Sequence, residues 1–238
     1  MDRNRRTALL AGLFFILTFV ASIPSALVLY RDVLDHANYI VGSGADARIR
    51  FGALLEVILA IANIGTAVVM FPILKRASEA VALGYVATRI LESTLIVVGL
   101  ISLLSVVTLR QDFASTNGGD PALYVGLGKA LVAIHDWTFL LGPAFCAGFG
   151  NGILLGYLMY RSGLVPRPMA VLGMIGGALA FGTATAVLFG AYEQTSGLSF
   201  LFTLPEVVWE AFLGIYLTFW GFLPSPVLEA QPVAATSA

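Results

Sequence analysis

Seven ionisable side chains lie inside, or at the edge of, long apolar stretches, and their types could support binding or acid–base chemistry. A charged side chain at the centre of a membrane helix costs roughly 2.5–3.5 kcal/mol by the lower estimates, so such residues usually face one another or a polar cavity. We therefore expect these seven to mark one buried polar site. They are Glu56, Arg89, Glu92, His135, Asp136, Glu206 and Glu210.

The balance of charge within this set is acidic. Arg89 can pair with one or two carboxylates through its planar guanidinium, but Glu56, Glu92, Glu206 and Glu210 supply four. The acids left over must be protonated, reach water or hold a cation. In such a site Arg89 would anchor an anionic group or tune the acids, and the carboxylates would bind cationic groups or carry a proton. An ion pair of Arg89 with Glu92 or Glu210 that only fixes helix packing is the alternative, and it leaves the other acids unexplained.

A metal site is a further alternative. Carboxylates with one histidine could hold iron or manganese inside a helical bundle, and the residues for it would be Glu56, Glu92, His135 and Glu210. The sequence has no Glu-x-x-His pair of the di-iron type, and its two histidines are too few for a three-histidine zinc site. No particular cofactor is implied. The single cysteine, Cys146, excludes an internal disulfide.

The elements that must position these residues are membrane helices. The chain is 58% hydrophobic and 11% charged, with a mean hydropathy of +0.90, whereas soluble domains carry about 25% charged residues. A spanning helix needs about 20 apolar residues, and six segments qualify. We predict an all-α, six-helix transmembrane bundle that forms one domain over residues 1–223. Its helices are expected at 7–30, 49–74, 80–109, 137–160 (with a backward extension to 123), 169–191 and 200–223.

The remaining segments set the boundaries and the orientation. The apolar run 7–30 is too long for the apolar core of a signal peptide, so we expect a retained first helix. Residues 224–238 are rich in Pro, Ala, Ser and Thr and are predicted to be a disordered tail. Basic residues favour the cytoplasmic side of a membrane, which predicts both termini inside. The residues that predict this are Arg3, Arg5, Arg6, Lys75, Arg76, Arg161 and Arg167.

We expect a multi-pass protein of the bacterial cytoplasmic (inner) membrane, with the lipid bilayer as one partner and a small molecule or cation as another. The net charge of −1 argues against nucleic acid, since phosphate binding needs a basic surface.

Helical spacing places further polar residues beside the acids. Asn63 follows Glu56 by seven residues, and Tyr85 precedes Arg89 by four, so each pair shares one helix face. With this orientation the polar residues run from the outer surface to the middle of the membrane, while the inner half is apolar. This pattern predicts an outward-opening vestibule with a closed floor rather than a channel.

Small residues predict how two of the helices pack. Ala144, Gly148, Gly152 and Gly156 recur every four residues, and Gly173 and Gly177 share that spacing in the next helix. Small residues let helix backbones approach closely in lipid, so we expect the fourth helix to pack against the fifth. Pro24 and Pro143 are expected to kink their helices.

Residues 82–92 (ALGYVATRILE) resemble the signature of an uncharacterised bacterial membrane family, domain-of-unknown-function family 4386. Residues 52–56 (GALLE), 160–166 (YRSGLVP) and 204–210 (LPEVVWE) resemble it too. The resemblance implies a multi-helix integral membrane protein and brings no established activity. The positions that look like the recurrent polar residues of this family are Glu56, Arg89, Glu92 and Glu210.

Three functions therefore stay open. The first is an outward-opening site for a small molecule or cation, in a transporter or a sensor. The second is an intramembrane enzyme using Glu/His acid–base or carboxylate–metal chemistry, with Glu92 or Glu210 as the acid and His135 and Asp136 at the entrance. The third is a structural scaffold whose polar residues only lock the helices together.

Overall fold

The computed structural model describes residues 1–36, 38–42, 44–116 and 119–229. These residues form helices and their connections, with no strand among them. Six of the helices are long and apolar enough to cross a membrane, which confirms the predicted all-α six-helix bundle. They are Arg3–Leu29, Asp46–Leu74, Glu79–Ser115, Pro121–Ser162, Arg167–Leu188 and Gly197–Phe219.

Two of the six spans contain π-helical turns. The first span consists of α1 (Arg3–Pro24) and the π-helix η1 (Ser25–Leu29). The fourth consists of five consecutive pieces, which are α5 (Pro121–Phe139), η3 (Leu140–Ala144), α6 (Phe145–Ala147), η4 (Gly148–Leu155) and α7 (Gly156–Ser162). The π-helix η1 follows Pro24, and η3 contains Pro143. The two prolines at which the sequence predicts kinks therefore lie beside η1 and inside η3, where the α-helical hydrogen-bond pattern changes, whereas η4 has no such proline.

The other four spans are single α-helices, α3 (Asp46–Leu74), α4 (Glu79–Ser115), α8 (Arg167–Leu188) and α9 (Gly197–Phe219). Two short helices lie in the connection between η1 and α3, namely α2 (Arg31–Asp35) and the 3-10 helix η2 (Tyr39–Val41). A third, α10 (Pro226–Glu229), follows α9.

The structure corrects three predicted boundaries. The third span ends at Ser115 rather than at 109. The fourth span begins at Pro121, whereas the sequence predicts a start at 137 with a backward extension to 123. The helix starts here because Pro121 occupies its first turn and Asp120 accepts a hydrogen bond from the backbone N–H of Ala122. The predicted tail is helical at Pro226–Glu229, and its residues 230–238 lie outside the described residues. Arg76 fixes α10 to the bundle by donating to the backbone carbonyl of Val227.

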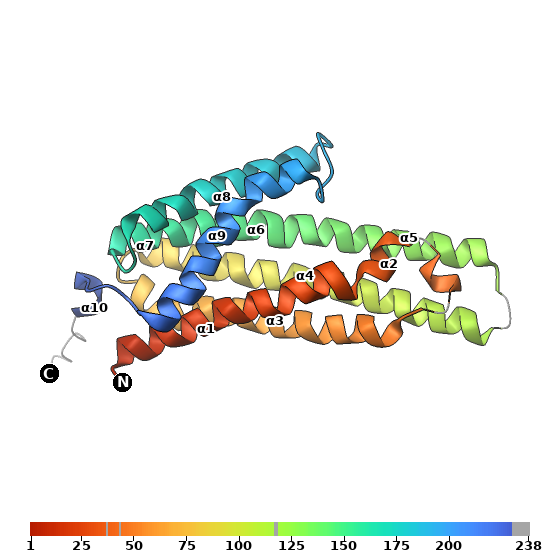
Figure 1. Cartoon of the computed structure of the whole chain (residues 1–238), viewed down its shortest axis with the longest axis horizontal. Helices are drawn as coiled ribbons and strands as arrows, with labels where there is room; N and C mark the ends of the chain where they lie inside the picture. The colour runs from red at the N-terminus through yellow and green to blue at the C-terminus, as the bar shows by residue number, and fades with distance from the viewer. Residues whose placement is uncertain (37, 43, 117–118, 230–238) are drawn as a thin grey trace, which may run out of the picture.

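The six spans form a closed ring in which α1 packs between α3 and α9, α3 packs on α4, and α4 packs on the fourth span. Helix α8 closes the ring between η4 and α9. In Figure 1, α8 and α9 are inclined to the other helices, and the N-terminus and α10 lie at one end of the bundle. We call this the terminal end. The opposite end, which carries α2, η2 and the α4–α5 connection, is called the loop end.

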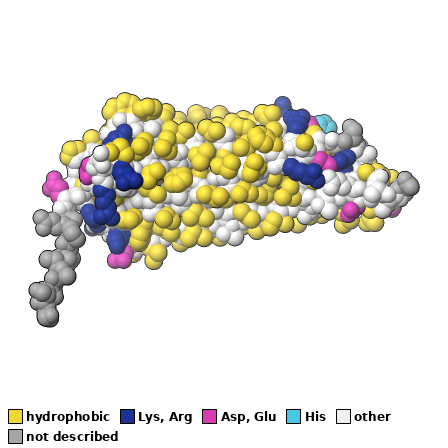
Figure 2. Space-filling view, turned by 90° about the horizontal axis from the view of Figure 1, so that it is seen from below, with side chains coloured by type: hydrophobic (Ala, Val, Ile, Leu, Met, Phe, Trp, Pro, Cys, Tyr) yellow, Lys and Arg dark blue, Asp and Glu magenta, His cyan; other side chains and the backbone are white. Residues whose placement is uncertain are grey.

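The outer surface has the distribution expected for a protein within a lipid bilayer. Figure 2 shows a broad band of hydrophobic side chains around the middle of the bundle, with Lys and Arg gathered towards its two ends. Within the spans, large apolar side chains such as Leu54, Ile61 and Ile101 are more than half exposed. The protein is therefore a multi-pass membrane protein.

Glycines bring the fourth span and α8 into backbone contact, as the spacing of small residues predicts. A Cβ added at Gly177 would lie 2.6 Å from the Cα of Gly152, and one added at Gly148 would lie 2.9 Å from the carbonyl oxygen of Gly177. Real Cβ atoms do not approach other atoms this closely, so only glycine fits here. The packing of the fourth helix against the fifth is confirmed.

Two apolar clusters leave a polar layer between them. The cluster at the terminal end draws residues from all six spans and includes Phe15, Ala67, Tyr85, Leu158, Ala170 and Leu213. The cluster at the loop end joins Tyr30, Val33 and Ile40 to α3 and α4. The ionisable residues predicted from the sequence lie in the layer between these clusters and at the loop end.

Candidate functional site

Arg89 is the centre of a closed hydrogen-bonded triangle between α3 and α4. Its guanidinium donates to Glu92 Oε2 at 2.7 Å and to Asn63 Oδ1 at 2.5 Å. The Asn63 amide donates in turn to Glu92 Oε1 at 3.1 Å, and Arg89 Nε donates to the Asn63 backbone carbonyl at 3.4 Å. All three side chains are buried, with exposed fractions of 2–5%. The spacing of three residues between Arg89 and Glu92 puts both on the same face of α4.

Helix α9 brings two more carboxylates to the same level of the bundle. Glu210 accepts a short hydrogen bond from the side-chain amide of Asn151 in η4. Glu206, one turn earlier, is 3% exposed, and both of its carboxylate oxygens are buried without a hydrogen-bond partner in the described part of the chain. Its Oε2 lies against Gly152, where a Cβ would be 2.5 Å away. Because Gly152 has no side chain, the Glu206 carboxylate has space beside it.

One cavity of about 200 Å³ connects these groups, and we call it the chamber. Its walls come from α1, α3, α4, the fourth span and α9. The polar side chains that line it include Asn63, Arg89, Glu92, Glu206 and Glu210. One guanidinium against three carboxylates gives the chamber a formal charge of −2 when all four groups are ionised. The structure therefore brings together four of the charged residues predicted from the sequence.

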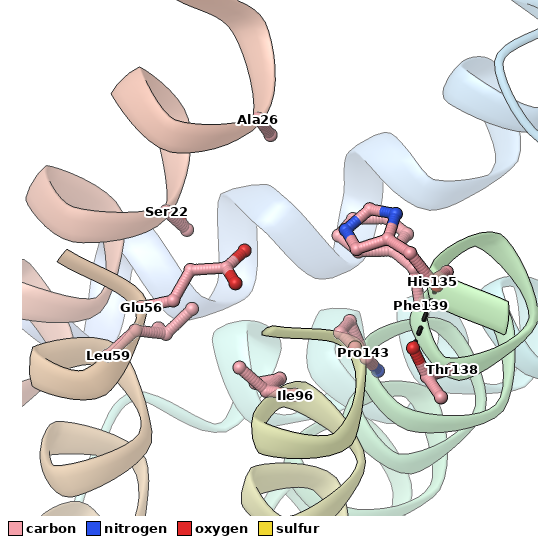
Figure 3. A pocket seen from close by; sticks show the side chains of 10 residues that line it. Ser22, Ala26, Glu56, Leu59, Ile96, His135, Thr138, Phe139 and Pro143 are labelled. Atoms are coloured by element: carbon pink, nitrogen blue, oxygen red, sulfur yellow. Dashed lines mark hydrogen bonds between the residues drawn. The ribbon is translucent and has the colours of Figure 1, made fainter. Parts of the chain in front are cut away.

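Glu56 and His135 lie in a neighbouring cavity of about 140 Å³, nearer the loop end, which we call the outer cavity. Figure 3 shows the Glu56 carboxylate from α3 and the His135 ring from α5 on opposite sides of this space. The two cavities share five lining residues, which are Ser22, Leu59, Ile96, Phe139 and Pro143. Glu56 does not line the chamber itself, so the predicted single site is divided into two adjacent cavities.

Asp136 lies further out, at the surface of the loop end. Its side chain is 63% exposed and stands 3.4 Å from the Nδ1 atom of His135. It lines a wide hollow of about 780 Å³ together with Arg31, Asp35 and Glu193. This hollow shares Ala26 with the outer cavity. Polar groups thus continue from the loop-end surface through the outer cavity to the chamber.

The side of the chamber towards the terminal end is closed. Thr66 donates to the Asn63 carbonyl at 2.7 Å and lies 3.3 Å from the Tyr85 hydroxyl. Tyr85 is fully buried within the terminal-end cluster and does not line the chamber. The sequence predicts Tyr85 as a ligand-binding residue beside Arg89, but its side chain packs in the terminal-end cluster and does not face the chamber.

The residues named for a metal site are not gathered at one point. Within residues 1–36, 38–42, 44–116 and 119–229, no three His, Cys, Asp or Glu side chains are arranged to hold a metal ion. Glu92 and Glu210 line the chamber, whereas Glu56 and His135 line the outer cavity.

The pattern of charged residues did not identify two further residues that belong to the site. Asn151 is fully buried and bonds to Glu210, and its own Oδ1 atom has no partner in the described part of the chain. Trp209 donates from Nε1 to the Asn151 backbone carbonyl at 2.9 Å. The one sequence signal for Asn151 is that it interrupts a glycine-rich apolar run, and Trp209 is indistinguishable in sequence from a packing residue.

The family comparison agrees with the resemblance seen in the sequence. The model of the family described as "Domain of unknown function (DUF4386)" matches residues 10–221, which is most of the chain and covers five of the six spans fully and most of the first. The chain belongs to the DUF4386 family. No curated protein and no solved structure matched it. The matched region of this DUF4386 protein contains the chamber, the outer cavity and every residue of the site.

Proposed function

We propose that this protein binds a small organic cation in the chamber, as the substrate of a transporter or the signal of a sensor. The observation that supports this most directly is Glu206, whose two carboxylate oxygens are buried beside a cavity without a partner among the described residues. A buried charge without a partner is costly. A ligand with a protonated nitrogen would supply the missing hydrogen bonds and the missing charge.

The hydrogen bonds of Arg89 favour a cation over an anion. The nitrogens Nε, Nη1 and Nη2 of this arginine already donate to Asn63 and Glu92. An anionic ligand would have to displace these bonds and would meet Glu206 and Glu210 across the cavity. A cation meets an excess of carboxylates, and Arg89 then acts by holding Glu92 in place.

A purely structural role accounts for only part of the site. The triangle of Arg89, Glu92 and Asn63 is fully paired and joins α3 to α4, as helix-locking polar groups do in membranes. Glu206 contributes no such bond to the described residues. An apolar residue at its position would pack against Gly152 without the cost of a buried carboxylate, so a scaffold does not explain it.

The arrangement of the cavities supports access from the loop end. The surface hollow, the outer cavity and the chamber follow one another, while the terminal-end cluster closes the opposite side. Basic residues at the terminal end, including Arg5, Lys75 and Arg161, support an orientation with both termini in the cytoplasm. The loop end then faces outwards, in a bacterial cytoplasmic membrane.

Ligand-induced stabilisation of the purified protein in lipid nanodiscs tests this proposal. A panel of primary and quaternary ammonium ions is compared with neutral alcohols of the same size, and native mass spectrometry records any bound molecule. At least one amine is expected to raise the unfolding temperature and to remain bound, because a ligand that binds only the folded state stabilises it. The alcohols are expected to have no effect.

The matched pair of variants is Glu206→Gln and Glu79→Gln. Glu79 is exposed in the first turn of α4, at the terminal end and outside both cavities. The Glu206 variant is expected to weaken amine binding at least tenfold, and the Glu79 variant to bind like the unchanged protein. Undiminished binding by the Glu206 variant, or no response to any amine, would contradict the proposed site.

A further inference from the structure

An apolar groove runs along the membrane-facing seam between α1 and α9. It has a volume of about 200 Å³ and is lined by Ile16, Phe19, Val20, Ala211, Gly214 and Ile215. Val20 is 59% exposed and Ile215 is 50% exposed, so the groove opens onto the lipid-facing surface. No polar side chain is among its lining residues.

The close crossing of the two helices explains where the groove ends. A Cβ added at Gly12 would lie 2.5 Å from the backbone nitrogen of Thr218, so α1 and α9 are in backbone contact towards the terminal end. Their inclination separates them towards the loop end (Figure 1). The groove occupies the space beside the crossing, and Gly214 forms part of its wall.

The groove and the chamber meet at Phe19, which lines both. Val207, which also lines the chamber, is 37% exposed, so the wall of the chamber at this residue is one side chain thick. The polar chamber and the apolar groove are therefore adjacent compartments along the seam between α1 and α9. A ligand with a charged head and an apolar body matches this division, whereas a fully polar ligand would leave the groove unused.

We propose that the ligand is a cationic amphiphile, whose ammonium or guanidinium head binds among Glu206, Glu210 and Glu92 and whose aliphatic or aromatic body lies in the groove between α1 and α9. This inference rests on the proposed function and specifies its ligand class. Two features support this inference. The first is the excess of carboxylates in the chamber, among which Glu206 has no partner in the described part of the chain. The second is the apolar groove next to the chamber. The head satisfies the carboxylates, and the body gains contact area that lipid chains would otherwise fill.

Dodecylamine serves as the probe in phosphatidylcholine nanodiscs, with dodecanol and propylamine as partial ligands. Dodecanol keeps the chain and lacks the charge, while propylamine keeps the charge and lacks most of the chain. Dodecylamine is expected to bind at least 100-fold more tightly than propylamine, and dodecanol is expected not to bind, as judged by native mass spectrometry and thermal stabilisation.

Two variants separate specific binding from the accumulation of dodecylamine in the lipid. Ala211→Phe fills the groove, and Val208→Phe adds the same ring at a lipid-facing position of α9 that lines neither compartment. The Ala211 variant is expected to weaken dodecylamine binding at least tenfold and to leave propylamine binding unchanged. The Val208 variant is expected to bind both amines like the unchanged protein.

The possible failures are distinguishable. Equal binding of the two amines, with no effect of Ala211→Phe, would contradict binding of the apolar body in the groove and would leave the cation site in place. Binding of dodecanol as tightly as dodecylamine would overturn recognition of the charged head. If neither amine binds, the proposed function and this inference both fail.

Discussion

Trp209 in α9 donates a hydrogen bond of 2.9 Å to the backbone carbonyl of Asn151 in η4. The same Asn151 donates through its side chain to Glu210, one residue after Trp209. Two bonds between neighbouring residues thus fix the π-helical segment of the fourth span to α9, directly beside the chamber. π-helical turns are often found at functional sites, and this one sets the position of Asn151.

Replacing Trp209 by Phe keeps an aromatic ring and removes the N–H donor. We expect a loss of about 1 kcal/mol in the free energy of unfolding, the usual contribution of one hydrogen bond, together with weaker amine binding because Asn151 and Glu210 lose their fixed position. Unfolding in sodium dodecyl sulfate measures the first effect. Trp220→Phe is the control, since Trp220 is 66% exposed whereas Trp209 is fully buried, and an equal effect of both variants would contradict the assigned role.

Two glycines of α8 are expected to respond to alanine in opposite directions. A Cβ at Gly177 would lie 2.6 Å from the Cα of Gly152, so Gly177→Ala forces the fourth span away from α8 and should cost about 1–3 kcal/mol, as overpacking does. A Cβ at Gly182 would meet nothing within 4 Å. Gly182→Ala should therefore stabilise the helix by about 0.5–1 kcal/mol. The same unfolding measurement compares them, and equal effects would show that close packing is not the cause.

The spans and the packing of the fourth helix on the fifth followed from the sequence because both depend on local patterns. Apolar length defines a span, and the four-residue spacing of Gly148 and Gly152 defines a helix face that packs closely. The π-helix η4 did not follow, because no proline marks the change from α- to π-hydrogen bonding at Gly148–Leu155.

The site was predictable in part for the same reason. Charged residues in apolar segments are conspicuous, and Arg89, Glu92, Glu206 and Glu210 do line one cavity. The separation of Glu56 from them depends on the apolar contact of Leu59 with Ala21 and Ile96, which belong to three different helices. The sequence of one helix does not contain that contact.

Removing Arg89 alone should be far more damaging than removing an exposed arginine. Arg89→Met leaves Glu92 buried without its partner, and broken buried pairs cost about 3–5 kcal/mol. The double variant Arg89→Met with Glu92→Leu should recover part of this loss, because Glu92 no longer remains as a buried charge without its ion-pair partner. The control is Arg31→Met, whose pair with Asp35 is exposed and 3.7 Å long and should change stability by less than about 1 kcal/mol. A double variant no better than the single one would contradict this explanation.

Stability should fall at alkaline pH through Tyr39 at the loop end. The Tyr39 hydroxyl donates to Asp46 at 2.9 Å, and burial, reinforced by this bond, raises the pKa of Tyr39 above its usual range. A group with a raised folded-state pKa gives its full stabilisation below its unfolded pKa, about 10 for Tyr, and loses it as the pH rises through the folded-state value.

The measurement compares the free energy of unfolding at pH 8 and above pH 10. Tyr39→Phe is expected to lose about 1 kcal/mol at pH 8 and then to show a smaller alkaline decrease than the unchanged protein. Tyr160→Phe at the terminal end, which also removes one hydroxyl, should leave the alkaline decrease as it is. An alkaline decrease that Tyr39→Phe does not reduce would assign the effect to other groups.

Cysteine labelling tests both the water-filled route and the orientation of the protein. Ser22 lines the outer cavity and the chamber, and Figure 3 places it beside Glu56. In a Cys146→Ser background, Ser22→Cys should react with a membrane-impermeant maleimide added to intact cells, because the loop end is proposed to face outwards. Ala67→Cys should stay unlabelled, since Ala67 is 1% exposed in the terminal-end cluster. Labelling of the Ser22 variant only after the membrane is opened would show that the orientation is the reverse of the proposed one. No labelling under either condition would mean that water does not reach the outer cavity. Ligand entry from the loop end would then be contradicted.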